Sequence, residues 1–152
     1  MREERINYRD GDFDVVITVG QARVIDSYVR ALLAQRATEE KRASKTEGAI
    51  ESIQETAKGI FHMYTFPTLV AGTREIASVN GAKLTLPTDP EKLTVADLIN
   101  LPERLVTKWE EKILDLNPHW RFGYNATEDK TDEFGEKVET EAKKVDESTK
   151  VS

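Results

Sequence analysis

The segment from Leu101 to Trp120, LPERLVTKWEEKILDLNPHW, constrains the fold of this chain more than any other. Pro102 suits the first turn of a helix, where its missing N–H leaves no partner unsatisfied, and Asn117-Pro118 ends the same helix. Between the prolines, apolar residues recur at three- and four-residue steps, with charged residues mostly around the other side. We therefore predict an amphipathic helix of about four turns whose apolar stripe belongs to the core. The stripe consists of Leu105, Val106, Trp109, Ile113 and Leu116.

A β-hairpin is predicted at the N-terminus, where Asp10-Gly11 separates two runs of alternating apolar residues. Asp-Gly is a preferred pair for two-residue turns because both central positions need a positive φ. This turn would pair Arg9 with Asp12 and gather one apolar face. An isolated hairpin is marginally stable, so we expect it to dock on the following helix or on the sheet edge of a partner. The face consists of Ile6, Tyr8, Phe13, Val15 and Ile17.

Two helices with apolar stripes are predicted after the hairpin. The first runs from Gln21 to about Arg36 and would cover the hairpin, and the charged stretch as far as Gly48 is predicted to be frayed helix ends and a loop. The second starts near Thr46, and Phe66-Pro67 should kink it or start a new helix, because proline lacks the N–H and disfavours the preceding helical residue. The first stripe consists of Val24, Ile25, Tyr28, Val29, Leu32 and Leu33, and the second of Ile50, Ile53, Ala57, Ile60, Phe61 and Tyr64.

The rest of the chain divides into a helical part and a charged tail. After Pro67 we expect helix to carry Leu69, Val70, Ile76 and Val79 down to the Asn80-Gly81 turn. Thr94 with Asp97 resembles a capping box that opens a further short helix. The predicted fold is mainly α, in the α+β class, with one helical domain over residues 1–124. Residues 125–152 hold nine acidic and five basic residues, a composition typical of a disordered tail that folds, if at all, on a partner.

Composition excludes several classes of function. With 28 acidic and 22 basic residues the net charge is −6, so no general basic field attracts nucleic acid or an anionic membrane. The chain has no cysteine, which removes disulfides, thiolate nucleophiles and Cys-based zinc sites. No apolar run approaches the roughly 20 residues of a membrane span, and the start, MREERINYRD, lacks the apolar run of a signal peptide. We expect a cytoplasmic protein that binds neither nucleic acid nor membrane.

No residue pattern indicates catalysis. The two histidines, His62 and His119, lack the spacing of a metal motif, and neither a G-x-S-x-G elbow nor a phosphate-binding glycine loop is present. We therefore expect no catalytic residue, no metal and no cofactor. Trp120, Phe122 and Tyr124 follow the helix stop at once, so they either cap the core or bind a partner. Phe61 and Tyr64 of the second helix are further candidates for partner binding.

Three segments carry a resemblance to a known family. The segment LPERLVTKWEEKILDLNPHW resembles the "LP…L…W…V…LNP.W" signature near the C-terminal end of small phage tail assembly proteins. FHMYTFPTLVAGT is similar to their helix-breaking "YP.L.A" stretch, with Phe66 where the family more often has Tyr. DVVITVGQARVIDSYVRALL resembles their opening of strand, glycine and helix. Together these segments span Asp14 to Trp120, and the family is the tail assembly chaperones of long-tailed bacteriophages and prophages.

The resemblance implies a non-enzymatic protein of the host cytoplasm. Such chaperones coat the tape measure protein and recruit tail tube subunits before the tail is complete. The role is physically reasonable, because a long helical tape measure exposes apolar stripes that would aggregate unless they are shielded. The alternative is a structural head-tail connector or tail completion protein that stays in the virion. The sequence leaves open whether the chain forms a homo-oligomer.

Overall fold

The structure, a computed structural model, describes residues 1–11, 13–44, 52–80 and 86–124. The described residues fall into two units, Met1–Pro118 and a second that begins at His119, and each is considered by itself. Several predictions lie outside the described residues: the placement of Asp12, the helix start near Thr46, the position of Ile50, the turn at Gly81 and the tail of residues 125–152. The α+β class is present, as helices with a three-stranded antiparallel sheet.

The sheet has the strand order β1-β2-β3 and an alternating pattern of burial. Its strands are β1 (Glu3–Asp10), β2 (Phe13–Gly20) and β3 (Thr73–Asn80). Side chains at every second position of β2 point to the core, as the pleat of a strand requires. The predicted alternating runs of the hairpin therefore form a sheet with one buried face. Its buried residues are Ile6, Phe13, Val15, Ile17, Val19 and Ile76.

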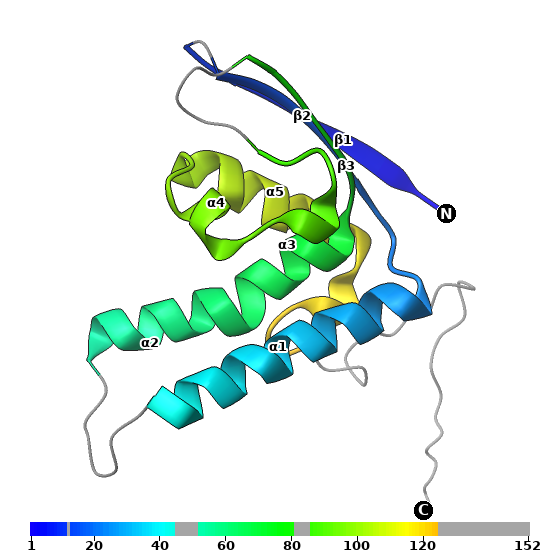
Figure 1. The fold of residues 1–152 in the computed structure, drawn as a ribbon. Coiled ribbons are helices and arrows are strands. Elements are labelled where there is room, and N and C mark those ends of the chain that lie inside the picture. The colour runs from blue at the N-terminus through cyan, green and yellow to red at the C-terminus, as the bar shows by residue number, and fades with distance from the viewer. Residues whose placement is uncertain (12, 45–51, 81–85, 125–152) are drawn as a thin grey trace, which may run out of the picture. The chain divides into compact units, whose positions relative to one another are not determined.

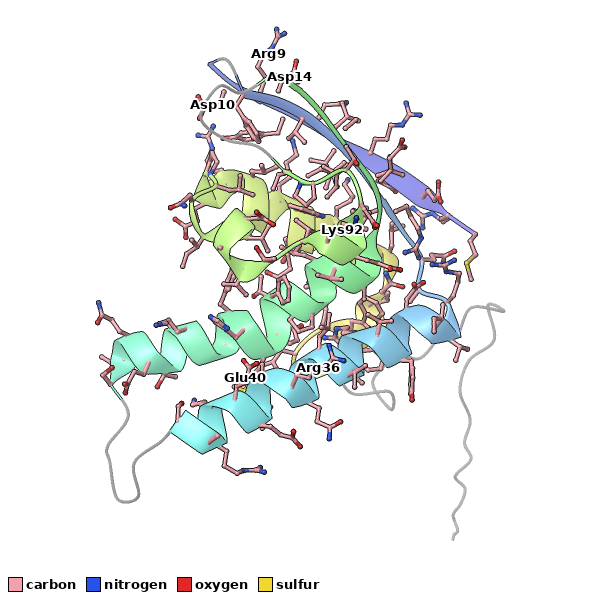
Figure 2. All side chains as sticks on the ribbon, viewed as in Figure 1. Arg9, Asp10, Asp14, Arg36, Glu40 and Lys92 are labelled. Atoms are coloured by element: carbon pink, nitrogen blue, oxygen red, sulfur yellow. The ribbon has the colours of Figure 1, made fainter. Side chains whose placement is uncertain are left out.

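The hairpin is present, but the predicted pairing of Arg9 with Asp12 is wrong. Arg9 pairs with Asp14 and Asp10 with Phe13. Gly11 thereby takes the first position of the loop with a φ of 62°, where glycine is preferred because it has no Cβ. The same register brings Arg9 and Asp14 into an ion pair at 3.2 Å, at the hairpin end labelled in Figure 2. The shift is two residues along the partner strand, so every side chain keeps its predicted face.

The helix predicted from Pro67 to Asn80 is wrong beyond Gly72, where the chain turns into β3. Thr73 ends the helix with extended backbone, and its hydroxyl donates to the carbonyl of Leu69. Ile76 then pairs with Ile17 of β2 and is buried. The free edge of β2 explains this outcome, because a strand that completes the sheet satisfies backbone groups that a hairpin alone would leave open.

The helix before β3 changes to a π turn just before Pro67, where the sequence predicts a kink or a new helix start, but Phe66 keeps helical backbone with φ −59° and ψ −49°. It begins as α2 (Ile53–Ile60), with Ser52 and Glu55 forming a capping box. A π turn, η1 (Phe61–Thr65), follows, and α3 (Phe66–Gly72) completes the run. The N–H of Phe66 donates to the carbonyl of Phe61, five residues back, which defines the wider turn. Pro67 therefore stands in the first turn of α3, and the backbone stays helical from α2 through η1 into α3.

Helix α1 (Val24–Ser44) corrects two predictions. It continues to Ser44, through most of the stretch predicted to be frayed helix ends and a loop, because the alanine, glutamate, lysine and arginine residues there favour helix. It also does not cover the hairpin, since it packs against η1 and α3. In Figure 1, α1 runs beside the α2–α3 helix on the side away from the sheet. The inward side of α1 therefore contacts other helical segments rather than the hairpin that the sequence predicts.

The sheet is covered by α5 (Glu103–Leu116), which contacts β1 and β2 directly. It is preceded by a short 3-10 turn (Pro90–Lys92) and by α4 (Val95–Ile99), whose predicted capping box between Thr94 and Asp97 is confirmed. Trp109 is fully buried, and its indole N–H donates to the hydroxyl of Thr73 at 2.8 Å. The core thus joins α5, the sheet and α3 in one unit. Leu105, Ile113 and Leu116 are buried with Trp109.

Asn117 ties the end of α5 to the loop between β2 and α1. Its side-chain amide donates to the carbonyls of Gly20 and Ile113, and its side-chain carbonyl accepts from the N–H of Ala22 at 2.7 Å. Asn117 is buried, and these bonds satisfy the polar atoms of its side chain. The residue that ends the helix therefore also fixes where α1 begins.

Candidate functional site

Helix α1 is docked with a mixed face inward, on which Val29 and Leu33 are half-buried beside Asp26 and Arg30. Asp26 is buried, and Arg30, one turn further on, is half-buried toward η1 and α3. On the opposite side, Val24 is 89% exposed and Tyr28 69% exposed, and Ile25 and Leu32 are also exposed. We call these four residues, Val24, Ile25, Tyr28 and Leu32, the α1 stripe. The predicted stripe of this helix is thus divided, with Val29 and Leu33 turned inward and the α1 stripe turned outward, and the charged residues of the inward face show what fixes this orientation.

The first cause is the environment of Asp26. Its carboxylate accepts hydrogen bonds from the backbone N–H and the guanidinium of Arg23, and from Arg74 at 2.9 Å. Burial alone would raise the pKa of Asp26, but the hydrogen bonds from Arg23 and the charge of Arg74 outweigh it and hold this pKa below its ordinary value. The carboxylate is therefore ionised and paired, which anchors the start of α1 to the beginning of β3.

The second cause is the position of Arg30 against the π turn. Its Nε donates to the hydroxyl of Thr68 at 2.9 Å, and its guanidinium carbon lies 5.2 Å from the ring centre of Tyr64. This is the geometry of a cation–π contact. Burial lowers the pKa of Arg30, and the contacts with Tyr64 and the charge of Glu110 act in the opposite direction. Arg30 thus holds the middle of α1 against η1 and α3.

Glu110 of α5 completes the cluster around the π turn. The side chain is half-buried and forms a hydrogen bond with the hydroxyl of Thr65. Burial raises the pKa of Glu110, and the neighbouring Glu111 raises it further, while Thr65 and Arg30 lower it. A half-buried carboxyl with a raised pKa is more common at functional sites than elsewhere. We call Arg30, Tyr64, Thr65, Thr68 and Glu110 the π-turn cluster.

Helix α2 also presents apolar side chains to solvent. Ile53 and Ile60, two turns apart, are both exposed, and Gly59 is the one buried residue of this helix. The predicted stripe of the second helix is therefore split. Its first part is exposed on α2, and its last two members, Phe61 and Tyr64, are half-buried in the π turn. Both helices that lie farthest from the sheet thus carry exposed apolar residues (Figure 1).

The aromatic segment after α5 presents a different surface from the one predicted. Trp120 is buried, whereas Phe122 is 90% exposed and Tyr124 is also exposed. The ring of His119 lies 6.0 Å from the ring of Trp120. Gly123, with a φ of 78°, allows the turn in which the N–H of Tyr124 donates to the carbonyl of Arg121. Of the candidates in this segment, Phe122 rather than Trp120 presents its ring to solvent.

The described residues contain no group of three or more histidine, aspartate or glutamate side chains placed to hold a metal ion. Within the same residues, no helix is both long and apolar enough to cross a membrane.

Comparisons with known proteins return no match: no family profile, no curated protein sequence and no solved structure matches this chain. Function is therefore inferred from the residues themselves and from the resemblance in the sequence.

The sequence predictions missed the π-turn cluster, although one signal was present. Asp26 and Arg30 lie four residues apart on α1, on the side opposite Val24, Tyr28 and Leu32 and next to Val29 and Leu33. Charges at that spacing are usually assigned to the solvent face of a helix. Their inward position depends on Arg74, Thr68 and the π turn, all distant in the sequence.

Proposed function

We propose that this chain is a non-enzymatic tail assembly chaperone of a long-tailed phage or prophage, acting in the host cytoplasm. It binds and shields the tape measure protein and helps to recruit tail tube subunits. One observation carries the proposal: the contacts of Asp26 and Arg30 fix one side of α1 inward, so the α1 stripe faces solvent as a preformed apolar surface. The resemblance of three sequence segments to this family supports the same role.

The α1 stripe has the dimensions of a helix-binding surface. Val24, Tyr28 and Leu32 repeat every four residues, which forms a ridge that packs into the groove of another helix. Four exposed apolar side chains make a small interface, and small interfaces favour reversible binding. Reversibility suits a chaperone, because the tape measure has to be released when the tube forms around it.

Polar residues bound the stripe along α1. Gln35, Arg36 and Glu39 continue the exposed side of the helix beyond Leu32. Arg36 and Glu40 are labelled on this part of α1 in Figure 2. A short apolar patch with a polar rim is the usual anatomy of a non-obligate interface. Phe122, Phe61 and Tyr64 remain further candidates for contact with the same partner.

The test compares two sets of variants in co-expression with a tape measure protein. Tyr28→Ser combined with Leu32→Ser removes apolar surface from exposed positions, so the free energy of unfolding should change by less than ~1 kcal/mol. Affinity for the tape measure should fall by ~2 kcal/mol or more, about 30-fold, and the soluble yield of the tape measure should fall with it. Gln35→Ser is the matched control on the same exposed side. Undiminished capture by the double variant would remove α1 from the interface.

The alternative role is a structural head-tail connector or tail completion protein. It would share the size and charge of this chain but would be retained in the finished particle. Mass spectrometry of purified virions separates the two roles, because a chaperone is absent from the particle and a connector is present in fixed copy number.

A further inference from the structure

Strand β1, dark blue in Figure 1, lies at an edge of the sheet. It pairs with β2 on one side, and among the described residues no strand pairs with its other side. Just before β1, the carbonyl of Arg2 accepts a hydrogen bond from the N–H of Gln21 at 3.0 Å. Because backbone hydrogen bonds alternate along antiparallel strands, even-numbered residues of β1 bond to β2, and odd-numbered residues direct their N–H and C=O groups to the outer edge. These groups can pair with a further strand.

The charges of β1 make the strand complementary to a second copy of itself. If two copies pair antiparallel about a two-fold axis at Ile6, each residue lies opposite the one equally far on the other side of Ile6. On the solvent face, Glu3 then lies opposite Arg9 of the second copy, and Arg5 lies opposite Asn7. All four side chains are exposed. Opposite charges directly across antiparallel strands stabilise the pair, so a favourable charge pair forms on each side of the axis.

The other face of β1 is complementary in the same register. Ile6 is buried on the core side and would lie opposite Ile6 of the second copy. Half-buried Tyr8 would lie opposite Glu4, and a tyrosine hydroxyl donates readily to a carboxylate. Arg2 and Asp10, both exposed, would form a further pair of opposite charges at the ends of the strand. Apolar, polar and charged positions of β1 thus each meet a suitable position of the second copy.

Neighbouring registers are disfavoured by the same residues. A shift of two residues in one direction places Arg5 opposite Arg5 of the second copy, and a shift in the other direction places it opposite Arg9. Like charges directly opposite each other destabilise strand pairing. A shift of one residue sets the core face of one copy beside the solvent face of the other. Charges on an edge strand usually prevent pairing, but those of β1 select one register.

We propose that β1 is a self-association edge, at which two copies of the chain pair antiparallel about Ile6 and form one continuous sheet. The two-fold axis closes this dimer, because both copies use the same residues and neither outer edge of β1 stays open. Strand pairing with a few side-chain contacts makes a small interface, so the dimer should be weak and depend on concentration. β1 and the α1 stripe are different elements, so this inference does not rest on the proposed function.

The experiment reverses charges in the full chain and measures its mass in solution. Glu3→Arg and Arg9→Glu each place like charges opposite each other, so each variant should repel its own copy. Mixing the two variants restores opposite charges at both positions across the strands. Glu75→Arg makes the same charge change as Glu3→Arg at an exposed position of β3 and is the matched control. Sedimentation velocity from about 1 to about 500 μM gives the dimer fraction, and urea unfolding shows that each variant is folded.

The parent and Glu75→Arg should dimerise with equal affinity. Glu3→Arg and Arg9→Glu, each alone, should dimerise about tenfold more weakly or worse, and their equimolar mixture should return to within about threefold of the parent. A parent that stays monomeric over the whole range overturns the proposal. A mixture that stays monomeric, or an equal loss of dimer in Glu75→Arg, overturns the pairing of β1 with β1.

Hydrogen exchange of the parent locates the contact without any substitution. As the concentration rises, protection should increase at the amides of Arg5, Asn7 and Arg9, because their N–H groups gain acceptors in the dimer. The amides of Ile6 and Tyr8 should change little, since they are already bonded to β2. Added protection that ignores this alternation would contradict the proposed pairing. None of these measurements involves tape measure capture, so the dimer and the proposed function can fail independently.

Discussion

Replacing Asp26 with asparagine tests how strongly the buried carboxylate of Asp26 holds α1 in its docked orientation. The carboxylate of Asp26 accepts three hydrogen bonds from Arg23, at 2.7, 2.9 and 2.9 Å, and one from Arg74 at 2.9 Å. Asp26→Asn keeps the shape of the side chain but removes the charge. It also turns an amide group toward guanidinium donors, which leaves part of the cluster unsatisfied.

The loss of stability in Asp26→Asn depends on which partner of Asp26 is shielded from water. The side chain of Arg23 is 55% exposed, so its pairing is screened and adds little. Arg74 is only 17% exposed, so its charge would be left largely buried without a counter-charge. Removing one partner of a buried ion pair costs about 3–5 kcal/mol of stability. The cost of Asp26→Asn should be smaller, because the asparagine oxygen still accepts a hydrogen bond and the contact with Arg23 is exposed to solvent. We expect Asp26→Asn to lower the free energy of unfolding by about 2–3 kcal/mol.

The pH dependence of the same variant gives a second measurement. Because the folded pKa of Asp26 lies below its ordinary value of 3.8, its stabilising contribution is present above that value and is lost as the pH falls through the folded pKa. The difference between parent and Asp26→Asn should therefore shrink under acid conditions. Urea unfolding followed by tryptophan fluorescence measures both effects. Glu39→Gln, an exposed carboxylate on the same helix, is the control, and equal midpoints for the two variants would refute the reasoning.

Four further predictions concern packing and the chain end. Gly72→Ala should destabilise the fold by about 1–3 kcal/mol in urea unfolding, because an added Cβ would lie 2.5 Å from Cγ2 of Ile113. Gly59→Ala should be neutral or stabilising by up to ~1 kcal/mol in the same assay, since only flexible side-chain ends lie near its Cβ and alanine favours helix. Trp109→Ala should cost about 3–5 kcal/mol through the cavity that it leaves. Deleting residues 125–152, predicted from sequence to be a tail, should move the melting midpoint by no more than a few degrees.

Local signals in the sequence predicted α5 and its core stripe, because two prolines bracket the helix and Leu105, Trp109 and Ile113 follow its period. The capping box at Thr94 was predictable for the same reason, since both of its partners lie within one turn. β3 was not predictable in this way. Its apolar residues fit a helix as well as a strand, and the choice depends on pairing with β2, more than fifty residues earlier.

The orientation of α1 shows the same limit at the candidate site. Its apolar residues were recognised, but all of them were assigned to one buried stripe. Val29 and Leu33 are half-buried, whereas the α1 stripe is exposed. Two long-range contacts help to fix this orientation. Arg74 reaches Asp26 across 48 residues of sequence, and Thr68 reaches Arg30 across 38. Asp26 and Arg30 are held inward by partners that lie far away in the sequence, so the sequence of α1 alone does not predict their burial.

The π turn joins α2 to α3 along one helical run. A residue advances an α-helix by about 100°, and a π turn accommodates one residue more than an α turn does. Removing one residue from Phe61–Thr65 would restore a regular α turn and leave the angular relation of α2 and α3 nearly unchanged, because the wider turn already accommodates the extra residue. Ile53 and Ile60 would then keep their direction, and α3, β3 and α5 would keep their packing. A single-codon deletion should thus remove the π turn without redirecting the exposed surface of α2.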